Sequence, residues 1–541
     1  MTRRRAGVTI LVFAAALAAC ESKGPERAGG AGVMASRAGA VGEFSDNPLL
    51  ALVPADSPYA FATFKAFPLE IAQRMSSAML PMWRQLLATA PAASNRTPEQ
   101  ERITKDVLDA VEHLDAKTIE DAGFSSKAKM VVYGLGAYPV VRIELASGDR
   151  VLDFVQRTAT RWGKTLPAPT ERAGRRYWIS DEPKVSVMFA IGAKEAMVVL
   201  APRATIDANL AVLLGEQKPA SSMTTAQFRA IAERDGFTGQ GVGFLDVARL
   251  GALVATTIAA APACDAAIAG LAKRVPRLAF GYDDLQAHRF AFGMVLELAP
   301  DLVAEVGGLA SPLVGLDQLL ATKPMMAVAL AVNVERGRGV LGRAAGALQA
   351  LGEQCQAAGM VSAMTSLASA ATRPLPPMFA GLRGGYLVLN QLKIGTGTQA
   401  QTDGFAAVQL DHPGELLKLA AGQLPSFNVP LDGKAHALPA MLPFTGHVAA
   451  NETSIGIGLG ANSATKAVDA IQGKPGPAPL LWVQYDYSRL GELMSAAMPQ
   501  GPGTDTMRDT MRDMMKMFGI ATIQWVADIR GLVMWMSLEV R

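Results

Sequence analysis

The feature that most constrains the fold is an internal duplication that runs from about residue 47 to the end of the chain. Five segments recur in the same order, at offsets of about 240–267 residues, with Pro58 matching Pro324 and Gly215 matching Gly473. The matched segments are 52–62 with 319–329, 141–154 with 408–419, 207–219 with 465–477, 244–251 with 484–491, and 294–298 with 536–540. Similarity at one long period indicates two copies of a structural unit. We therefore expect homologous repeats at residues 47–300 and 301–541.

Each repeat is predicted to be α+β, with a mainly antiparallel sheet and packed helices. Runs rich in β-branched and aromatic residues, many joined by short turns, favour antiparallel pairing. Helices occur between them but do not alternate strictly with strands, which argues against a doubly wound parallel sheet. Predicted strands are 59–64, 130–133, 140–145, 185–191, 196–201, 278–282, 290–298, 325–334, 385–390, 404–410, 454–459, 481–485, 522–527 and 531–539, and predicted helices are 69–90, 98–113, 150–162, 204–214 and 225–234.

The N-terminal segment has the layout of a secretory signal. Three arginines at 3–5 precede an apolar run of 14 residues at 6–19, and Cys20 follows directly. A run of this length is too short to span a bilayer comfortably, and a plain signal peptide needs no cysteine. Leu17, Ala18, Ala19 and Cys20 resemble the lipobox of bacterial lipoproteins. The resemblance implies a signal peptide at 1–19 and acylation, such as palmitate, on Cys20.

Lipidation of Cys20 would set the location of the protein. Glu21 follows the cysteine, and an acidic residue other than aspartate favours the outer membrane in the enterobacterial sorting pattern. The expected partner is therefore the outer membrane, with the folded body in the periplasm or at the cell surface. Residues 20–46 are rich in Gly, Ala and Ser without an apolar period, so we predict a flexible tether there.

Charge and composition narrow the function further. The chain has 541 residues, of which 50% are hydrophobic and 18% charged, so it can bury a large core. Loss of Arg3, Arg4 and Arg5 with the signal would leave equal numbers of basic and acidic residues. No electrostatic footprint for nucleic acid remains.

Three cysteines divide between two roles. With Cys20 assigned to lipid, Cys264 and Cys355 remain, and an oxidising envelope compartment would allow them to form a disulfide. The alternative is two buried thiols that behave as small apolar side chains. Sequence alone leaves this choice open.

A methionine-rich segment near the C-terminus is the densest local signal. Helical spacing places Met507, Met511, Met514 and Phe518 on one face, opposite a charged face. The favoured interpretation is an amphipathic helix that packs on the sheet. The alternatives are an adaptable apolar-ligand surface and a soft-metal site for Cu(I).

Two Asp-x-x-Arg pairs occupy matching positions in the halves. Asp246 and Asp486 each stand where a strand gives way to a helix, so we expect helix N-caps. Arg249 and Arg489, three residues further on, are placed to pair with them. Recurrence in both halves favours a structural role over an active site.

Motifs for nucleotide or metal chemistry do not occur. The glycine runs at 239–243 and 456–460 fit neither G-x-G-x-x-G nor a P-loop, and glycine in strands more often marks close packing. The histidines are not in metal-ligand spacing, and no Gly-x-Ser-x-Gly elbow occurs. The sequence thus predicts no metal, no cofactor and no enzymatic activity.

The start of the folded body, residues 54–59, resembles the opening of large uncharacterised secreted or lipid-anchored bacterial proteins, which implies no particular activity. The leading hypothesis is a non-catalytic cell-envelope lipoprotein with a binding or assembly role, partnered by an envelope protein or lipid. The alternatives are a periplasmic carrier of lipid or another apolar ligand, and a hydrolase whose catalytic residues are distant in sequence.

Overall fold

A computed structural model describes most of the chain after residue 43. The described residues are 44–66, 68–89, 97–112, 115–180, 185–257, 262–316, 323–376, 379, 381–393, 401–424, 427–439, 445–498, 501 and 504–541. The predicted signal peptide, Cys20 and most of the predicted tether lie outside them. Phe44, assigned to the tether, is buried against Phe64 with ring centroids 4.7 Å apart, so it belongs to the folded body.

The first half of the chain contains ten strands. Its elements are η1 (Pro48–Leu52), β1 (Tyr59–Ala62), α2 (Leu69–Thr89), α3 (Pro98–Glu112), α4 (Ala116–Asp121), β2 (Met130–Leu135), β3 (Tyr138–Glu144), α5 (Gly148–Arg161), β4 (Thr170–Arg172), β5 (Arg175–Ile179), β6 (Ser186–Ile191), β7 (Glu195–Ala201), α6 (Arg203–Leu213), α7 (Thr225–Asp235), β8 (Val242–Asp246), α8 (Val247–Thr257), α9 (Pro262–Arg274), β9 (Arg277–Gln286) and β10 (Arg289–Glu297).

The second half follows with a similar alternation of helices and strands. Its elements are α10 (Pro300–Gly307), β11 (Leu313–Val314), β12 (Met326–Leu330), α12 (Val334–Gln354), α13 (Ala358–Thr372), β13 (Leu382–Lys393), β14 (Gln401–Leu410), α15 (Pro413–Gln423), β15 (His436–Ala437), β16 (Gly446–Ala450), β17 (Ser454–Leu459), α16 (Ser463–Asp469), β18 (Pro475–Gly476), β19 (Leu481–Asp486), α17 (Tyr487–Ala497), α18 (Thr504–Lys516), β20 (Phe518–Asp528) and β21 (Gly531–Val540).

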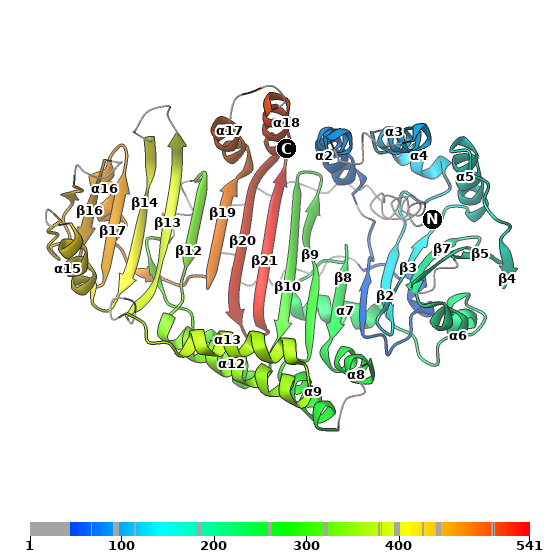
Figure 1. Ribbon diagram of the computed structural model, residues 1–541, viewed down its shortest axis with the longest axis horizontal. Helices are drawn as coiled ribbons and strands as arrows, with labels where there is room; N and C mark the ends of the chain where they lie inside the picture. The colour runs from blue at the N-terminus through cyan, green and yellow to red at the C-terminus, as the bar shows by residue number, and fades with distance from the viewer. Residues whose placement is uncertain are drawn as a thin grey trace.

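Nineteen strands form one antiparallel sheet, which confirms the α+β class (Figure 1). The hydrogen-bonded pairs give the spatial order β4-β5-β6-β7-β3-β2-β1-β8-β9-β10-β21-β20-β19-β12-β13-β14-β17-β16-β15. The two edges are the shortest strands of this sheet, since β4 has three residues and β15 has two. All three residues of β4 are exposed.

The strands on the two sides of the β10–β21 pair are connected in the same way. β1 lies between β2 and β8, and β12 lies between β13 and β19. The register agrees as well. Ala62 faces Val242 in the β1–β8 pair, and the β12–β19 pair places Ala329 opposite Trp482, which lie 267 and 240 residues further on. These separations equal the offsets of the matched sequence segments.

The centre of this arrangement is a glycine–tryptophan pair. β10 and β21 form nine residue pairs from Arg289–Glu539 to Glu297–Gly531, and the fifth pair is Gly293–Trp535. A Cβ atom on Gly293 would lie 2.2 Å from a ring carbon of Trp535. The indole therefore occupies the space that any other residue at 293 would fill.

One face of the sheet carries the main core, and we call it the covered face. Ala279, Val295 and Val533 lie on it and are fully buried. In the first half this face packs against η1, α6 and α7, and in the second half against the segments around β11 and the end of α16.

A buried arginine also lies on the covered face. Arg142 of β3 is fully buried; its Nε donates to the Tyr133 hydroxyl at 3.2 Å and its Nη2 to the Leu213 carbonyl at 2.8 Å. Its Nη1 pairs with Glu195, which also accepts from Arg175 at 2.8 Å. Burial raises the pKa of the Tyr133 phenol, which stays neutral. A buried charge is tolerated when its donors are all partnered, and this network joins β2, β3, β7 and α6.

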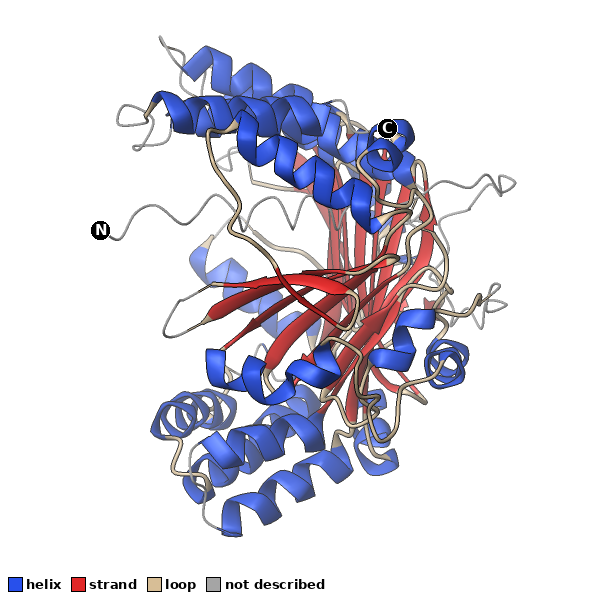
Figure 2. Cartoon of the chain, turned by 90° about the vertical axis from the view of Figure 1, so that its right-hand side faces the viewer, coloured by secondary structure: helices blue, strands red, loops and turns tan. Residues whose placement is uncertain are grey.

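Two rows of helices stand at opposite ends of the strands (Figure 1). One contains α2, α3, α4, α5, α17 and α18, and the other contains α8, α9, α12 and α13. α2 packs against α18 in the first row, and α12 packs against α9 in the second. Seen along the sheet, the two rows project to the same side of it (Figure 2). Among the described helices, none has the length and apolar character needed to cross a membrane.

We predict that Gly293→Ala lowers the free energy of unfolding by about 1–3 kcal/mol, because the added methyl group overpacks the indole of Trp535. The measurement is the denaturant midpoint of the full chain with and without Trp535→Leu. In the Trp535→Leu background the cost of Gly293→Ala should fall to less than half. An equal cost in both backgrounds would contradict the assignment.

Candidate functional site

The second face of the sheet carries a continuous set of apolar side chains, which we call the apolar face. Because opposite residues of antiparallel strands share a face and successive residues alternate, the register places these side chains together. The set is Tyr59, Phe61, Leu245, Leu278, Phe280, Tyr282, Phe290, Phe292, Met294, Leu296, Leu532, Met534, Met536, Leu538, Ile523, Trp525, Leu481, Val483, Tyr485, Met326, Val328, Leu330, Leu387, Leu389 and Ile457.

The apolar face differs from the covered face in its exposure. None of its members is buried, and the exposed fractions of Leu330, Leu387 and Ile457 are 43%, 43% and 36%. The neighbours that alternate with Leu330 and Leu387, namely Ala329 and Val388, are fully buried on the other face. The described residues therefore leave this side of the central strands without a covering layer.

The apolar face is uncharged. In each of its strands, the alternate positions between the first and last members hold no Asp, Glu, Lys or Arg. Burial raises the pKa of the Tyr59 and Tyr282 phenols, so these groups are neutral at physiological pH. A large uncharged apolar surface on a folded chain marks an interaction site.

Helices close the same face of the sheet towards its two edges. In the first half, Val151 of α5 joins a cluster with Ile191 and Ala196 of the outer strands. In the second half, Leu417 of α15 packs with Leu410 and Ile455. The uncovered part is consequently confined to the central strands, from β1 to β13, with Ile457 beside it.

Aromatic rings gather on the first half of the apolar face. The ring of Phe61 stacks on Phe280 at 6.0 Å, and Tyr282 meets Phe290 and Phe292 edge-on at 5.6 and 5.9 Å. These offset and edge-to-face contacts hold the rings against one another. We call these five residues the aromatic cluster.

The predicted helix caps are confirmed. Asp246 Oδ1 accepts from the backbone N–H of Arg249 at 3.0 Å, and Asp486 Oδ1 accepts from that of Ser488 at 3.0 Å. Both carboxylates satisfy free amides at the start of a helix, so they stabilise the framework.

The predicted Asp–Arg pairing holds in one half only. The Arg249 guanidinium lies 3.6 Å from Asp246 and also donates to the carbonyls of Ala55 and Ser57. Arg489 instead donates to the carbonyls of Lys323 and Asn390. The prediction failed there because a carbonyl close in space but distant in sequence competes for the same donors.

The glycine runs serve close packing, as predicted. A Cβ on Gly243 would lie 2.5 Å from the Phe280 ring, and one on Gly458 would lie 2.0 Å from the Ser463 carbonyl oxygen. In both places a side chain would displace a neighbouring element.

The methionine-rich segment forms α18, but its contacts differ from the prediction. Met511 and Met514 are half-buried, whereas Met515 is buried and packs on Gly491 of α17. The helix ends at Lys516, so Phe518 belongs to β20 and its ring contacts Tyr487. The side chain of Met507 lies outside the described residues. Packing against α17 fixed the buried edge of the helix, which its own periodicity could not reveal.

A disulfide joins the two halves of the chain. The sulfur atoms of Cys264, in α9, and Cys355, directly after α12, are bonded, and their Cα atoms are 4.7 Å apart. The bond fixes the contact between α9 and α12 in one helix row. Around the corresponding contact of α2 with α18, the described residues place no cysteine.

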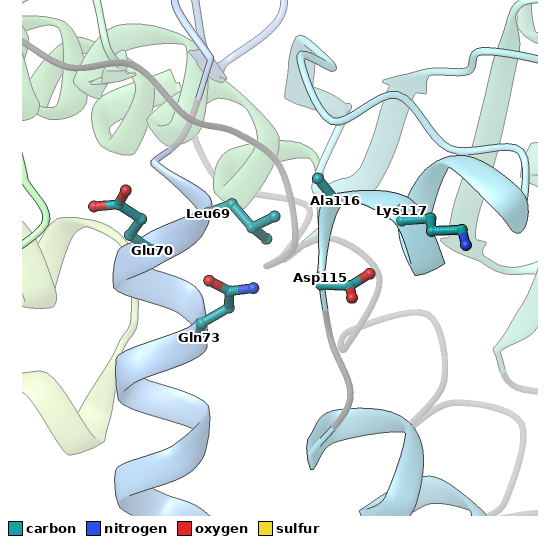
Figure 3. A pocket seen from close by; sticks show the side chains of 6 residues that line it. All are labelled: Leu69, Glu70, Gln73, Asp115, Ala116 and Lys117. Atoms are coloured by element: carbon teal, nitrogen blue, oxygen red, sulfur yellow. The ribbon is translucent and has the colours of Figure 1, made fainter.

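One pocket of about 320 Å³ lies between the start of α2 and the start of α4 (Figure 3). Asp115 caps α4 by accepting from the Thr118 backbone N–H at 2.6 Å, and this hydrogen bond lowers the pKa of its carboxyl. Glu70 and Lys117 point away from each other on opposite sides (Figure 3). The charged groups do not converge, and the pocket lining contains neither serine nor histidine.

The histidines are dispersed. His447 Nδ1 lies 2.8 Å from the Ser463 hydroxyl, and His436 lies 3.1 Å from Asp432. In the described part of the chain, no three His, Cys, Asp or Glu side chains are grouped closely enough to hold a metal ion.

Comparisons with known proteins add little. No family model matches the sequence, and no curated protein is significantly similar to it. A solved structure described as crystal form III of TP0453 aligns with 48% of this chain and 82% of its own, at 8% identity and a TM-score of 0.22. A TM-score of that size supports no conclusion on fold or function.

We predict that the double variant Cys264→Ala/Cys355→Ala loses about 2–5 kcal/mol of stability, because the bond constrains a loop with a sequence separation of 91 residues. The measurement is the thermal unfolding midpoint. A thiol reductant should lower the midpoint of the wild type to that of the variant and leave the variant unchanged. A wild-type midpoint that reductant does not alter would refute the role of the bond.

Proposed function

We propose that this protein is a non-catalytic, lipid-anchored envelope protein that binds a lipid or another apolar ligand on its apolar face. The observation that carries the proposal is the uncovered, uncharged side of the central strands. It selects ligand binding from the hypotheses that the sequence left open, because neither a catalytic constellation nor an assembly surface is needed to account for it.

The chemistry of the face favours hydrocarbon over a protein partner. A protein interface has a polar rim and about one hydrogen bond per 100–200 Å². The apolar face offers only phenol hydroxyls, such as those of Tyr59 and Tyr485, and the Tyr59 hydroxyl already donates to Ala137. Hydrocarbon requires no hydrogen bonds, so it can cover this surface without leaving polar groups unsatisfied.

The dimensions of the face also suit lipid. Eight adjacent central strands, from β1 to β12, span about 34 Å at the usual spacing of about 4.8 Å. One leaflet of a bilayer is about 15 Å of hydrocarbon, so an extended acyl chain fits within this width. Each methylene removed from water contributes up to about 0.8 kcal/mol.

We further propose that residues 47–300 and 301–541 are homologous repeats. The identical strand connections on the two sides of β10–β21, the matching register and the matched sequence segments support this. Under this proposal the apolar face spans the junction of the copies.

The anchor is proposed from the sequence alone. Residues 1–19 would be removed as a signal peptide, and acylated Cys20 would hold the body at the outer membrane. Two or more acyl chains give stable attachment.

The anchor predicts that cells fed radioactive palmitate label the wild-type chain and the Cys264→Ala variant, whereas Cys20→Ala abolishes the label. The reason is that only Cys20 follows the lipobox-like segment. The measurement is autoradiography of the immunoprecipitated protein. An unlabelled wild type, or a labelled Cys20→Ala variant, would rule out the anchor.

Ligand binding predicts that full-length Cys20→Ala protein, mixed with phosphatidylethanolamine–phosphatidylglycerol vesicles and separated from them, carries lipid in native mass spectrometry. Met534→Asp should reduce the bound fraction at least tenfold, because it places a charge on the apolar face. A chain that is always ligand-free would refute the proposal.

The matched control is Ile529→Asp. Ile529 is 93% exposed in the turn that joins β20 to β21, so the same apolar-to-charge change occurs on the same hairpin but off the apolar face. Its bound fraction should equal that of the parent. An equal loss in both variants would assign the effect to the hairpin and count against the apolar face.

A further inference from the structure

The two halves of the apolar face differ in side-chain chemistry. The shared register makes Phe61 of β1 equivalent to Val328 of β12, because they face Gly243 and Val483 in corresponding strand pairs. In the same way Phe280 corresponds to Ile523. Aromatic rings in the first half are thus replaced by aliphatic side chains in the second.

The halves differ in exposure as well. All three members of the apolar face with at least 36% exposure, Leu330, Leu387 and Ile457, belong to the second half. Val132, the first-half equivalent of Leu387, is only partly exposed, and Thr63, the equivalent of Leu330, is buried and accepts from the Met130 backbone N–H at 2.8 Å. The uncovered aliphatic area is therefore concentrated on one half.

Ring packing accounts for the difference. In the aromatic cluster, Phe61, Phe280 and Tyr282 cover one another, and so do Phe290 and Phe292. Their ring faces are already in contact, and an aromatic side chain has few rotamers with which to adapt. Leucine, isoleucine and methionine side chains have no such mutual stacking and adjust to a flexible chain.

We infer that the ligand is a lipid with flexible acyl chains, and that these chains lie on the second half of the apolar face, over β20, β19, β12 and β13, beside the aromatic cluster. The inference rests on the proposed function and adds the ligand class and the place of binding. A rigid polycyclic ligand would instead favour the flat rings of the first half.

Trp525 supplies a local reporter. It lies on β20 within the second half of the apolar face, whereas Trp482 and Trp535 are buried on the covered face. The probe is phosphatidylcholine with a dibrominated acyl chain, added to full-length Cys20→Ala protein. Bromine quenches indole emission on close approach. We expect quenching in the parent and the loss of most of it in Trp525→Phe.

Paired substitutions test the place independently. Leu387→Asn should raise the lipid concentration for half-saturation about tenfold, since an exposed leucine side chain in contact with the ligand is lost. Val132→Asn, at the equivalent register position of the first half, should change it less than twofold. Thermal midpoints of both variants check folding, and the Trp525 measurement does not depend on either variant.

The outcomes separate the two proposals. Absence of lipid in native mass spectrometry for the parent overturns the proposed function, and the inference with it. Bound lipid with quenching that Trp525→Phe leaves unchanged, or with equal effects of Leu387→Asn and Val132→Asn, overturns only the placement on the second half. Quenching through Trp525 with a selective Leu387→Asn effect supports both.

Discussion

The pairing of β10 with β21 is the interaction on which the rest of the structure depends. Without it, the chain would form two smaller sheets, each with a long unpaired inner edge of the kind that recruits other strands. Nine residue pairs remove both edges at once and make a single sheet. The Gly293–Trp535 pair at their centre allows the indole to lie where a second large side chain would collide. The open apolar face exists as one surface because this ladder is continuous.

The covering of only one side decides what the sheet can do. An antiparallel sheet commonly buries one face and solvates the other with polar side chains. Here the second face is apolar in its central strands, as Phe292, Met294 and Met534 illustrate. The disulfide and the helix contacts hold the borders of that face, while α5 and α15 close its outer parts. This division between fixed borders and an uncovered centre underlies the proposed binding of lipid.

Sequence reasoning reached the features that depend on local patterns. The caps at Asp246 and Asp486 and the packing glycines follow from neighbouring residues, and most central strands were located. Helix α12 was missed, because its many glycines weaken the helical pattern. The buried Arg142 and the open face could not be predicted. A strand such as β10, apolar on both sides, has the pattern of a strand covered on both faces, and only the tertiary structure shows which side lacks a partner.

The outermost strands have a consequence for crowding. A sheet of this width offers its ends to neighbouring molecules, and proteins confined to a membrane surface meet at high local concentration. β4 consists of the exposed residues Thr170, Glu171 and Arg172, and β15 contains only two residues. Such short or charged ends cannot template an added strand over any length. The chain can therefore be densely arrayed without polymerising end to end, and each copy keeps its own separate sheet.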